Sequence, residues 1–256
     1  YHEVKRKGDL YFLGFGVSEY KNRNLNLKYA HKDVLDLAKV FQKMGKKYGE
    51  VRIRTYVNEQ VTAESIKKAA SFLKQAGVDD TVVLMIAGHG VHDTDKNATY
   101  YYLTHETDID NLKGSAVNFE LIESLLDGLK SRRKIFFMDT CESGEADDMA
   151  LARGFEGPDS RRIKARSSRA FVTVLKDRRK KGNRDFLFRK ERYIYNNLVR
   201  RTGAVVVSSS MGGELSYESD QLKNGFFTRE IINALKGRAD LVRDGVISLK
   251  ELKDYV

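Results

Sequence analysis

The chain has 256 residues, 41% of them hydrophobic, and a formal net charge of +10; this length can bury the core of one large α/β domain. Its single cysteine excludes an internal disulfide, and no run reaches the roughly 18 apolar residues that span a membrane. We therefore expect a cytoplasmic protein without membrane contact. Because the chain begins at Tyr1 without Met or signal peptide and stops in a predicted helix, we also expect a fragment of a longer protein.

Strand-like and helix-like segments alternate along the chain. Continuous apolar, β-branched runs predict buried strands, and apolar residues at helical spacing predict amphipathic helices. The predicted strands cover residues 10–16, 51–56, 81–86, 100–104, 134–138 and 203–208. The predicted helices cover residues 27–48, 62–77, 118–129 and 226–235, and the second of them is capped by Thr62. A last helix is predicted to begin at a capping box of Ser248 and Glu251. This alternation predicts a single α/β domain over residues 1–256, with three layers in which helices cover both faces of a mostly parallel central sheet.

The basic charge is concentrated in one segment. Residues 153–201 hold 17 Lys and Arg against five Asp and Glu, whereas the rest of the chain holds 29 against 31. The surrounding region, about residues 145–201, contains the only proline and shows no lasting periodicity, so we predict a long insertion. The domain as a whole does not have the charge of a nucleic-acid binder.

Two apolar runs end at a reactive residue that is followed by small or polar residues. One run passes through residues 85–90, Met-Ile-Ala-Gly-His-Gly, to His89, and the other passes through residues 136–144 to Cys141, the only thiol. Active sites of open α/β sheets collect beyond the carboxyl ends of the strands, and we expect these two strands to be neighbours. Alone, such a Cys is usually an inert buried residue and a Gly-His-Gly usually a turn. Their matched placement favours a nucleophile–base pair.

The chemistry that this pair predicts is that of a cysteine peptidase. A thiol attacks as thiolate, and a nearby imidazole serves as general base or ion-pair partner. Cys141 is therefore the predicted nucleophile, and His89 the predicted base and later acid. Gly88 and Gly90 are expected to turn the backbone sharply beside His89 and to leave its amide free. The amides of Gly90 and Cys141 would then form an oxyanion hole, worth roughly a few kcal/mol per donor.

These motifs resemble those of the caspase-like peptidases, the group of caspases, metacaspases and paracaspases. Ala-Gly-His-Gly at residues 87–90 is similar to the family's histidine motif, and Asp-Thr-Cys-Glu-Ser-Gly at residues 139–144 is similar to the metacaspase nucleophile motif. The resemblance runs from residues 14–20 to residues 244–247 and is nearest to bacterial caspase domains, which are often fused to repeat or sensor domains. It implies a caspase–haemoglobinase fold and peptide-bond hydrolysis through an acyl-thioenzyme, without a cofactor.

The resemblance also covers two acids that predict the substrate. Asp139 stands two residues before Cys141, where metacaspases and paracaspases carry an acid that binds a basic P1 side chain, and Asp33 resembles a second pocket acid of those relatives. Two carboxylates in a partly desolvated pocket would select Arg or Lys through charge-assisted hydrogen bonds. The alternative is that both are ordinary polar residues at the ends of elements. We expect a protein or peptide substrate with a basic P1 residue.

Weaker candidates lie at and after the end of the predicted strand over residues 203–208. Ser208 and Ser209 are predicted to contact the P1 residue. Glu214, Glu218 and Asp220 occupy the region where relatives form a substrate-binding loop, although loop acids are usually just solvated.

A preference for Arg or Lys at P1 predicts a role for the basic insertion in self-processing. The insertion lies where caspases are cut between their large and small subunits, so an enzyme that cleaves after Arg or Lys would process its own zymogen there. A solvated surface excursion is an alternative of similar weight. Contact with nucleic acid or another anionic surface through residues 161–169 or 178–184 is the least favoured interpretation, because aromatic residues are sparse there.

No metal site is predicted. His92 and His105 are expected to be surface residues, because no acid or thiol cluster lies at ligand spacing from them. Residues 240–251 have the pattern of a calcium loop, but Val242 occupies the third ligand position and helix capping explains the last polar residues. Calcium activation stays open only because some metacaspases show it.

The sequence thus predicts a caspase-like cysteine endopeptidase that cleaves after Arg or Lys. The rival interpretation is a non-catalytic interaction module of the same fold, against which the intact Cys and His argue. A further alternative, compatible with a peptidase, is a domain that stays latent until a sensor domain or partner orders residues 145–200.

Overall fold

The computed structural model describes residues 7–93, 99–143, 163–165, 197–209 and 217–256, and its centre is a seven-stranded sheet. Five parallel strands lie in the order β2 (Val51–Val57), β1 (Leu10–Gly16), β3 (Thr81–His92), β6 (Arg133–Ser143) and β8 (Val205–Ser208). Two short antiparallel strands, β4 (Tyr100–Tyr102) and β5 (Val117–Asn118), extend the sheet beside the end of β3. The prediction of a mostly parallel sheet is confirmed.

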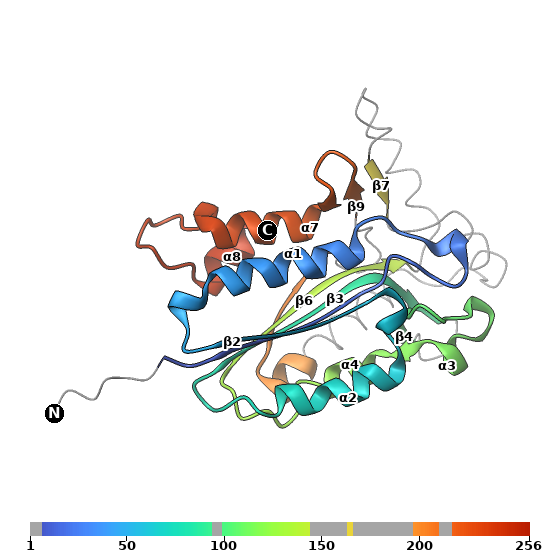
Figure 1. The fold of residues 1–256 in the computed structure, drawn as a ribbon, viewed down its shortest axis with the longest axis horizontal. Helices are drawn as coiled ribbons and strands as arrows, with labels where there is room; N and C mark the ends of the chain where they lie inside the picture. The colour runs from blue at the N-terminus through green and yellow to red at the C-terminus, as the bar shows by residue number, and fades with distance from the viewer. Residues whose placement is uncertain (1–6, 94–98, 144–162, 166–196, 210–216) are drawn as a thin grey trace.

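Helices cover both faces of this sheet (Figure 1). One layer holds α1 (Ala30–Lys43), α7 (Phe226–Asn233) and α8 (Leu249–Tyr255), and the other holds α2 (Ala63–Leu73), α3 (Leu112–Ser115) and α4 (Phe119–Ser124). The fold therefore has the three α/β/α layers that the sequence predicts. Within the described part of the chain, no helix is both long and apolar enough to cross a membrane.

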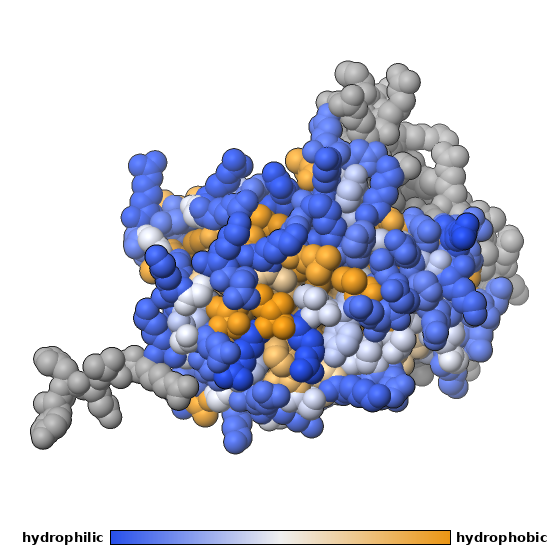
Figure 2. All heavy atoms as spheres, viewed as in Figure 1, coloured by the Kyte–Doolittle hydropathy of each residue, from blue (hydrophilic) through white to orange (hydrophobic). Residues whose placement is uncertain are grey.

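The sheet separates two apolar cores, and side-chain alternation along each strand supplies both. In β3, Val82 and Leu84 belong to the core under α2 and α4, whereas Val83 and Met85 belong to the core under α1 and α7. A strand covered on both faces needs apolar residues at every position, which explains its continuous hydrophobic run. Figure 2 shows that hydrophilic side chains cover most of the visible surface.

The observed helices are shorter than the predicted ones, each for a local reason. Helix α1 begins at Ala30 because the two preceding backbone amides donate to the Glu218 carboxylate. Helix α4 ends at Ser124, before turns that lead to Gly128 with φ +65°. The predicted capping box of the last helix is confirmed: the Ser248 hydroxyl accepts from the Glu251 amide.

Both strands that carry the candidate motifs are longer than predicted. β3 continues to His92 and β6 to Ser143, because the two strands stay paired with each other and β4 also pairs with the end of β3. β8 begins at Val205 instead of Gly203, whose φ of +66° is not that of a strand. Residues 197–202, in and just after the predicted insertion, form a helix.

A second, three-stranded antiparallel sheet was not predicted. It consists of β10 (Asn224–Gly225), β9 (Tyr217–Ser219) and β7 (Ile163–Ala165). Strands of two or three residues are too short to show a period of two in the sequence. β7 lies within the predicted basic insertion, most of which is outside the described residues.

The start of α2 gives a stability prediction. The Thr62 hydroxyl accepts the Ser65 amide at 3.0 Å, as an N-cap does. Replacing it (Thr62→Ala) should lower the free energy of unfolding by about 1 kcal/mol, measured by urea denaturation. The matched variant Thr62→Ser keeps the hydroxyl and should stay close to the original chain; equal losses in both variants would contradict the capping role.

Candidate active site

The pairing of β3 with β6 brings the two candidate motifs together. Their parallel register makes Cys141 the partner of His89 and Glu142 the partner of Gly90. The prediction that these strands are neighbours is confirmed. Gly90 also faces Tyr102 of β4 on its other side, so both predicted oxyanion donors belong to paired strands.

A change of partner strand occurs along β3 next to His89. β1 pairs with β3 as far as Ala87, and β4 pairs with it from Gly90 onward. Between them Gly88 adopts φ +144°, and a Cβ at this position would lie 2.9 Å from the Tyr20 hydroxyl. The expected sharp turn is wrong, because the strand continues, but the position does require glycine.

The His89 ring is buried and oriented by the loop that follows β1. Its exposed fraction is 1%, and its ring centroid lies 5.1 Å from that of Tyr20. Nε2 lies 2.8 Å from the Leu25 carbonyl oxygen. A carbonyl only accepts hydrogen bonds, so Nε2 carries the proton and the neutral ring has its basic lone pair on Nδ1.

The backbone of His89 is held by the same loop. Its N–H donates to the Tyr20 hydroxyl at 3.0 Å, so the expectation that this amide is free is wrong. The Asn26 side chain accepts from the Tyr20 amide at 2.8 Å, and the Asn58 side chain accepts from the Ser18 amide at 2.9 Å. These bonds fix the loop that positions the imidazole.

Sequence reasoning missed both residues that orient the imidazole. Leu25 acts through its carbonyl, which every residue has, so its side chain carries no signal of this role. Tyr20 was noted only as part of a family resemblance, and its contact with His89 depends on how the loop after β1 folds back.

The segment that leads to Cys141 is tied to its neighbours on both sides. The Thr140 and Tyr100 hydroxyls lie 2.8 Å apart. On the other side, Ser208 pairs with Met138, and the Ser209 amide donates to the Met138 carbonyl at 2.9 Å. The structure therefore places both predicted substrate-contacting serines beside the strand that leads to Cys141.

The two predicted pocket acids are wholly buried and meet the same turn of the chain. Asp33 accepts from the Asn224 side chain at 2.8 Å and from the Gly225 amide at 3.0 Å, and Asp139 accepts from the Thr228 hydroxyl at 2.6 Å. These donors stand at the start of α7, within one helical turn of one another. They are neutral, so they stabilise the carboxylates without cancelling their charge.

Two of the loop acids contact the start of α1. Glu218 is 4% exposed and accepts from the Lys28 and Tyr29 amides, at 2.9 Å each. Asp220 forms an ion pair with Lys28 at 2.8 Å. The two acids attach the second sheet to the start of α1; Glu218 is buried there, whereas the side chain of Asp220 is 38% exposed. Glu214 lies outside the described residues.

His92 and His105 were both predicted at the surface, and the prediction is wrong for His92. His92 is 2% exposed and packs on Tyr100, with 4.9 Å between ring centroids. It is buried because β3 extends past its predicted end and β4 covers it. His105 is partly exposed, and its Nδ1 lies 2.6 Å from the Glu19 carbonyl oxygen.

In the loop with the calcium-like pattern, residues 240–251, backbone amides donate to the carboxylates. The Asp240 carboxylate accepts from the Asp244 and Gly245 amides, and the Glu251 carboxylate accepts from the Leu241 amide. In the part of the chain that the structure describes, no group of three or more His, Cys, Asp or Glu side chains is placed to hold a metal ion.

Comparisons with known proteins bear on this arrangement. Residues 13–253 match the caspase domain family, a span that includes His89, Cys141 and both buried acids. The chain belongs to the caspase domain family. Among solved structures, this caspase domain resembles the crystal structure of protein GSU0716 from Geobacter sulfurreducens. The two sequences are 17% identical, the match covers 89% of this chain and 82% of that chain, and the TM-score is 0.58. That similarity shows the fold alone. A search of curated proteins finds no match.

The hydrogen bond to Leu25 predicts the tautomer of the His89 ring. In ¹⁵N-histidine NMR spectra at a pH where the rings are neutral, His89 should carry its proton on Nε2. His105 is the matched contrast, since its Nδ1 faces a carbonyl and should carry the proton. Single His→Gln variants assign the signals, and an Nδ1 proton on His89 would contradict the proposed orientation.

Proposed function

We propose that this caspase domain is a cysteine endopeptidase that cleaves peptide bonds after Arg or Lys, with Cys141 as nucleophile and His89 as general base. The observation that carries the proposal is the register of β3 and β6, which makes these two residues partners. The orientation of His89 adds support, because the hydrogen bond to Leu25 leaves Nδ1 as the basic atom.

The reaction has two steps. In the first, His89 takes the thiol proton, the sulfur attacks the carbonyl carbon, and the oxyanion is held by the amides of Gly90 and Cys141. The C–N bond then breaks, the amine leaves with the proton from His89, and a thioester remains. In the second step, His89 takes a proton from water and the hydroxide attacks the thioester carbonyl carbon. The C–S bond then breaks, the carboxylic acid product leaves, and His89 returns the proton to the Cys141 thiolate.

The basic P1 preference rests on Asp33 and Asp139. Both carboxylates are buried and held by neutral donors at the start of α7, and Asp139 is two residues before the nucleophile. A guanidinium or ammonium group entering beside them would replace hydration by charge-assisted hydrogen bonds. We propose Ser208, Ser209 and Glu214 as further contacts of the substrate.

The regulation and setting of the enzyme are also proposals. An enzyme with this specificity would process its own zymogen in the basic segment of residues 145–201, and a sensor domain or other partner would control it. We propose a bacterial, cytoplasmic protein that needs no cofactor and does not act through nucleic acid or a membrane. Its single cysteine, which excludes an internal disulfide, suits a reducing compartment.

Matched fluorogenic peptides ending in Arg, Lys or Asp test the reaction. The protein should cleave after Arg and Lys, and Cys141→Ala should lower the rate at least about a thousandfold without loss of the folded state. Cleavage only after Asp would keep the peptidase and contradict the acidic pocket. A complete lack of cleavage, with and without calcium and with candidate partners, would favour the non-catalytic interaction module.

The acidic pocket makes a separate prediction. Asp139→Asn keeps the shape of the side chain and its acceptor for Thr228 but removes the charge. The kcat/KM for Arg peptides should fall about 10- to 100-fold, as expected for a lost charge-assisted hydrogen bond. The control is Asp254→Asn, which removes an exposed charge of α8. Equal effects of the two variants would contradict the pocket.

A further inference from the structure

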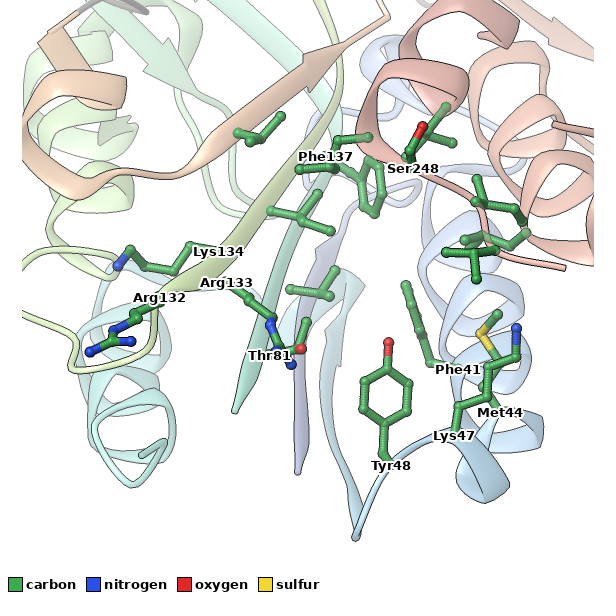
Figure 3. Close-up of a pocket in the computed structure, with 18 of the residues that line it drawn as sticks. Phe41, Met44, Lys47, Tyr48, Thr81, Arg132, Arg133, Lys134, Phe137 and Ser248 are labelled. Carbon is green, nitrogen blue, oxygen red and sulfur yellow. The ribbon is translucent and has the colours of Figure 1, made fainter. Parts of the chain in front are cut away.

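A cavity lies at the end of the sheet opposite His89. It is bounded by the first residues of three strands, Thr81 of β3, Arg133 of β6 and Val205 of β8, and has a volume of about 560 Å³. Helix α1 and residues 245–252 close it from the side (Figure 3). This volume is within the roughly 300–1,000 Å³ of small-molecule sites. No part of the proposed peptidase reaction uses it.

The walls of the cavity are apolar because it lies in the core under α1 and α8. Val83, Ile135 and Phe137 face it from the sheet, and Phe41 and Leu252 face it from these two helices. Side chains of a strand alternate between faces, so every second residue of β6 contributes to this wall. Such walls favour a hydrocarbon chain or ring.

The charge at the mouth of the cavity is positive. None of the described residues that line it has a carboxylate side chain, whereas four of them are Lys or Arg. Arg133 shares the face of Ile135 and Phe137, and Figure 3 shows it beside Thr81 at the open end. Exposed Lys47 adds a second positive charge to the rim.

Two of the four cations point elsewhere. By alternation, Lys134 belongs to the opposite face of β6. Figure 3 shows Lys134, and Arg132 just before the strand, directed away from the space beside Phe137. The Lys134 ammonium donates to the Ser131 carbonyl. Arg133 is therefore the cation of β6 that is aimed at the mouth.

Arg133 and Tyr48 together provide donors for an anion. The arginine uses one N–H on the Asp79 carbonyl at 3.4 Å, and a guanidinium has five such donors. The Tyr48 hydroxyl points into the cavity in Figure 3. Burial raises the pKa of Tyr48, and the nearby charge of Arg133 opposes this shift. The phenol thus stays protonated and able to donate near neutral pH.

We propose that this cavity binds a small amphipathic anion, a hydrocarbon chain or ring that ends in one carboxylate. The hydrocarbon lies against Phe41, Ile135 and Phe137, and the carboxylate accepts from Arg133 and Tyr48. A metal ion does not fit the carboxylate-free lining, and a polyanion does not fit the apolar walls. The site is separate from the peptidase and does not depend on its activity.

Dodecanoate and dodecanol are the probes that test this site, each displacing a fluorescent dansyl-labelled undecanoate from the protein. Dodecanoate should bind saturably at one site. Arg133→Gln should weaken dodecanoate binding about tenfold, the loss of one charge-assisted hydrogen bond, and leave dodecanol binding unchanged. Arg132→Gln is the matched control, since it removes the same charge from a side chain directed away from the space beside Phe137, and should change neither.

Three results would overturn the proposal. One is the absence of saturable binding, as when a segment of the protein's own chain fills the cavity. Another is equal weakening by Arg132→Gln and Arg133→Gln, which indicates attraction by surface charge alone. The third is unchanged dodecanoate binding in Arg133→Gln. Circular dichroism confirms that each variant is folded, and methyl NMR shifts of Val83 and Ile135 on adding dodecanoate support the site without any substitution.

Discussion

The parallel pairing of β3 and β6 is the constraint on which the rest of the site depends. It extends over eleven residue pairs, from Thr81 and Arg133 at the amino end to beyond His89 and Cys141. Because successive side chains of a strand point to opposite faces, a slip of one residue would send the apolar residues of β6 to the wrong cores. The burial of both faces therefore sets the register that makes the two catalytic candidates partners.

Two sets of polar contacts support the residues around this pair. The loop after β1 brings Tyr20 and Leu25 to His89, and the start of α7 brings neutral donors to Asp33 and Asp139. Buried polar groups are costly unless hydrogen-bonded, so these contacts hold the site in a single arrangement. The opposite end of the same strands has apolar walls and a cationic mouth, a different chemistry from that of the carboxyl end.

Strand and helix types followed from the pattern of apolar residues, but their ends did not. Strands β3 and β6 were expected to end before His89 and Cys141, yet both continue past these residues. Gly88 and Gly90 read as turn residues in isolation, and only the neighbouring strands explain why the backbone stays extended there. Likewise, Glu218 read as a solvated loop acid, although it binds the amides before α1, some 190 positions earlier in the chain.

The pocket acids were identified through the family resemblance. The sequence by itself determined the layered α/β architecture, the neighbouring strands of the two motifs and the identity of the candidate nucleophile and base. It did so because apolar periodicity and reactive residue types are local properties of the chain. Only the tertiary structure decided which carbonyl orients His89, which donors hold the two acids, and where the amphipathic cavity opens. Those features join residues far apart in sequence, and the Leu25 carbonyl and the Gly225 amide are backbone groups that no residue type signals.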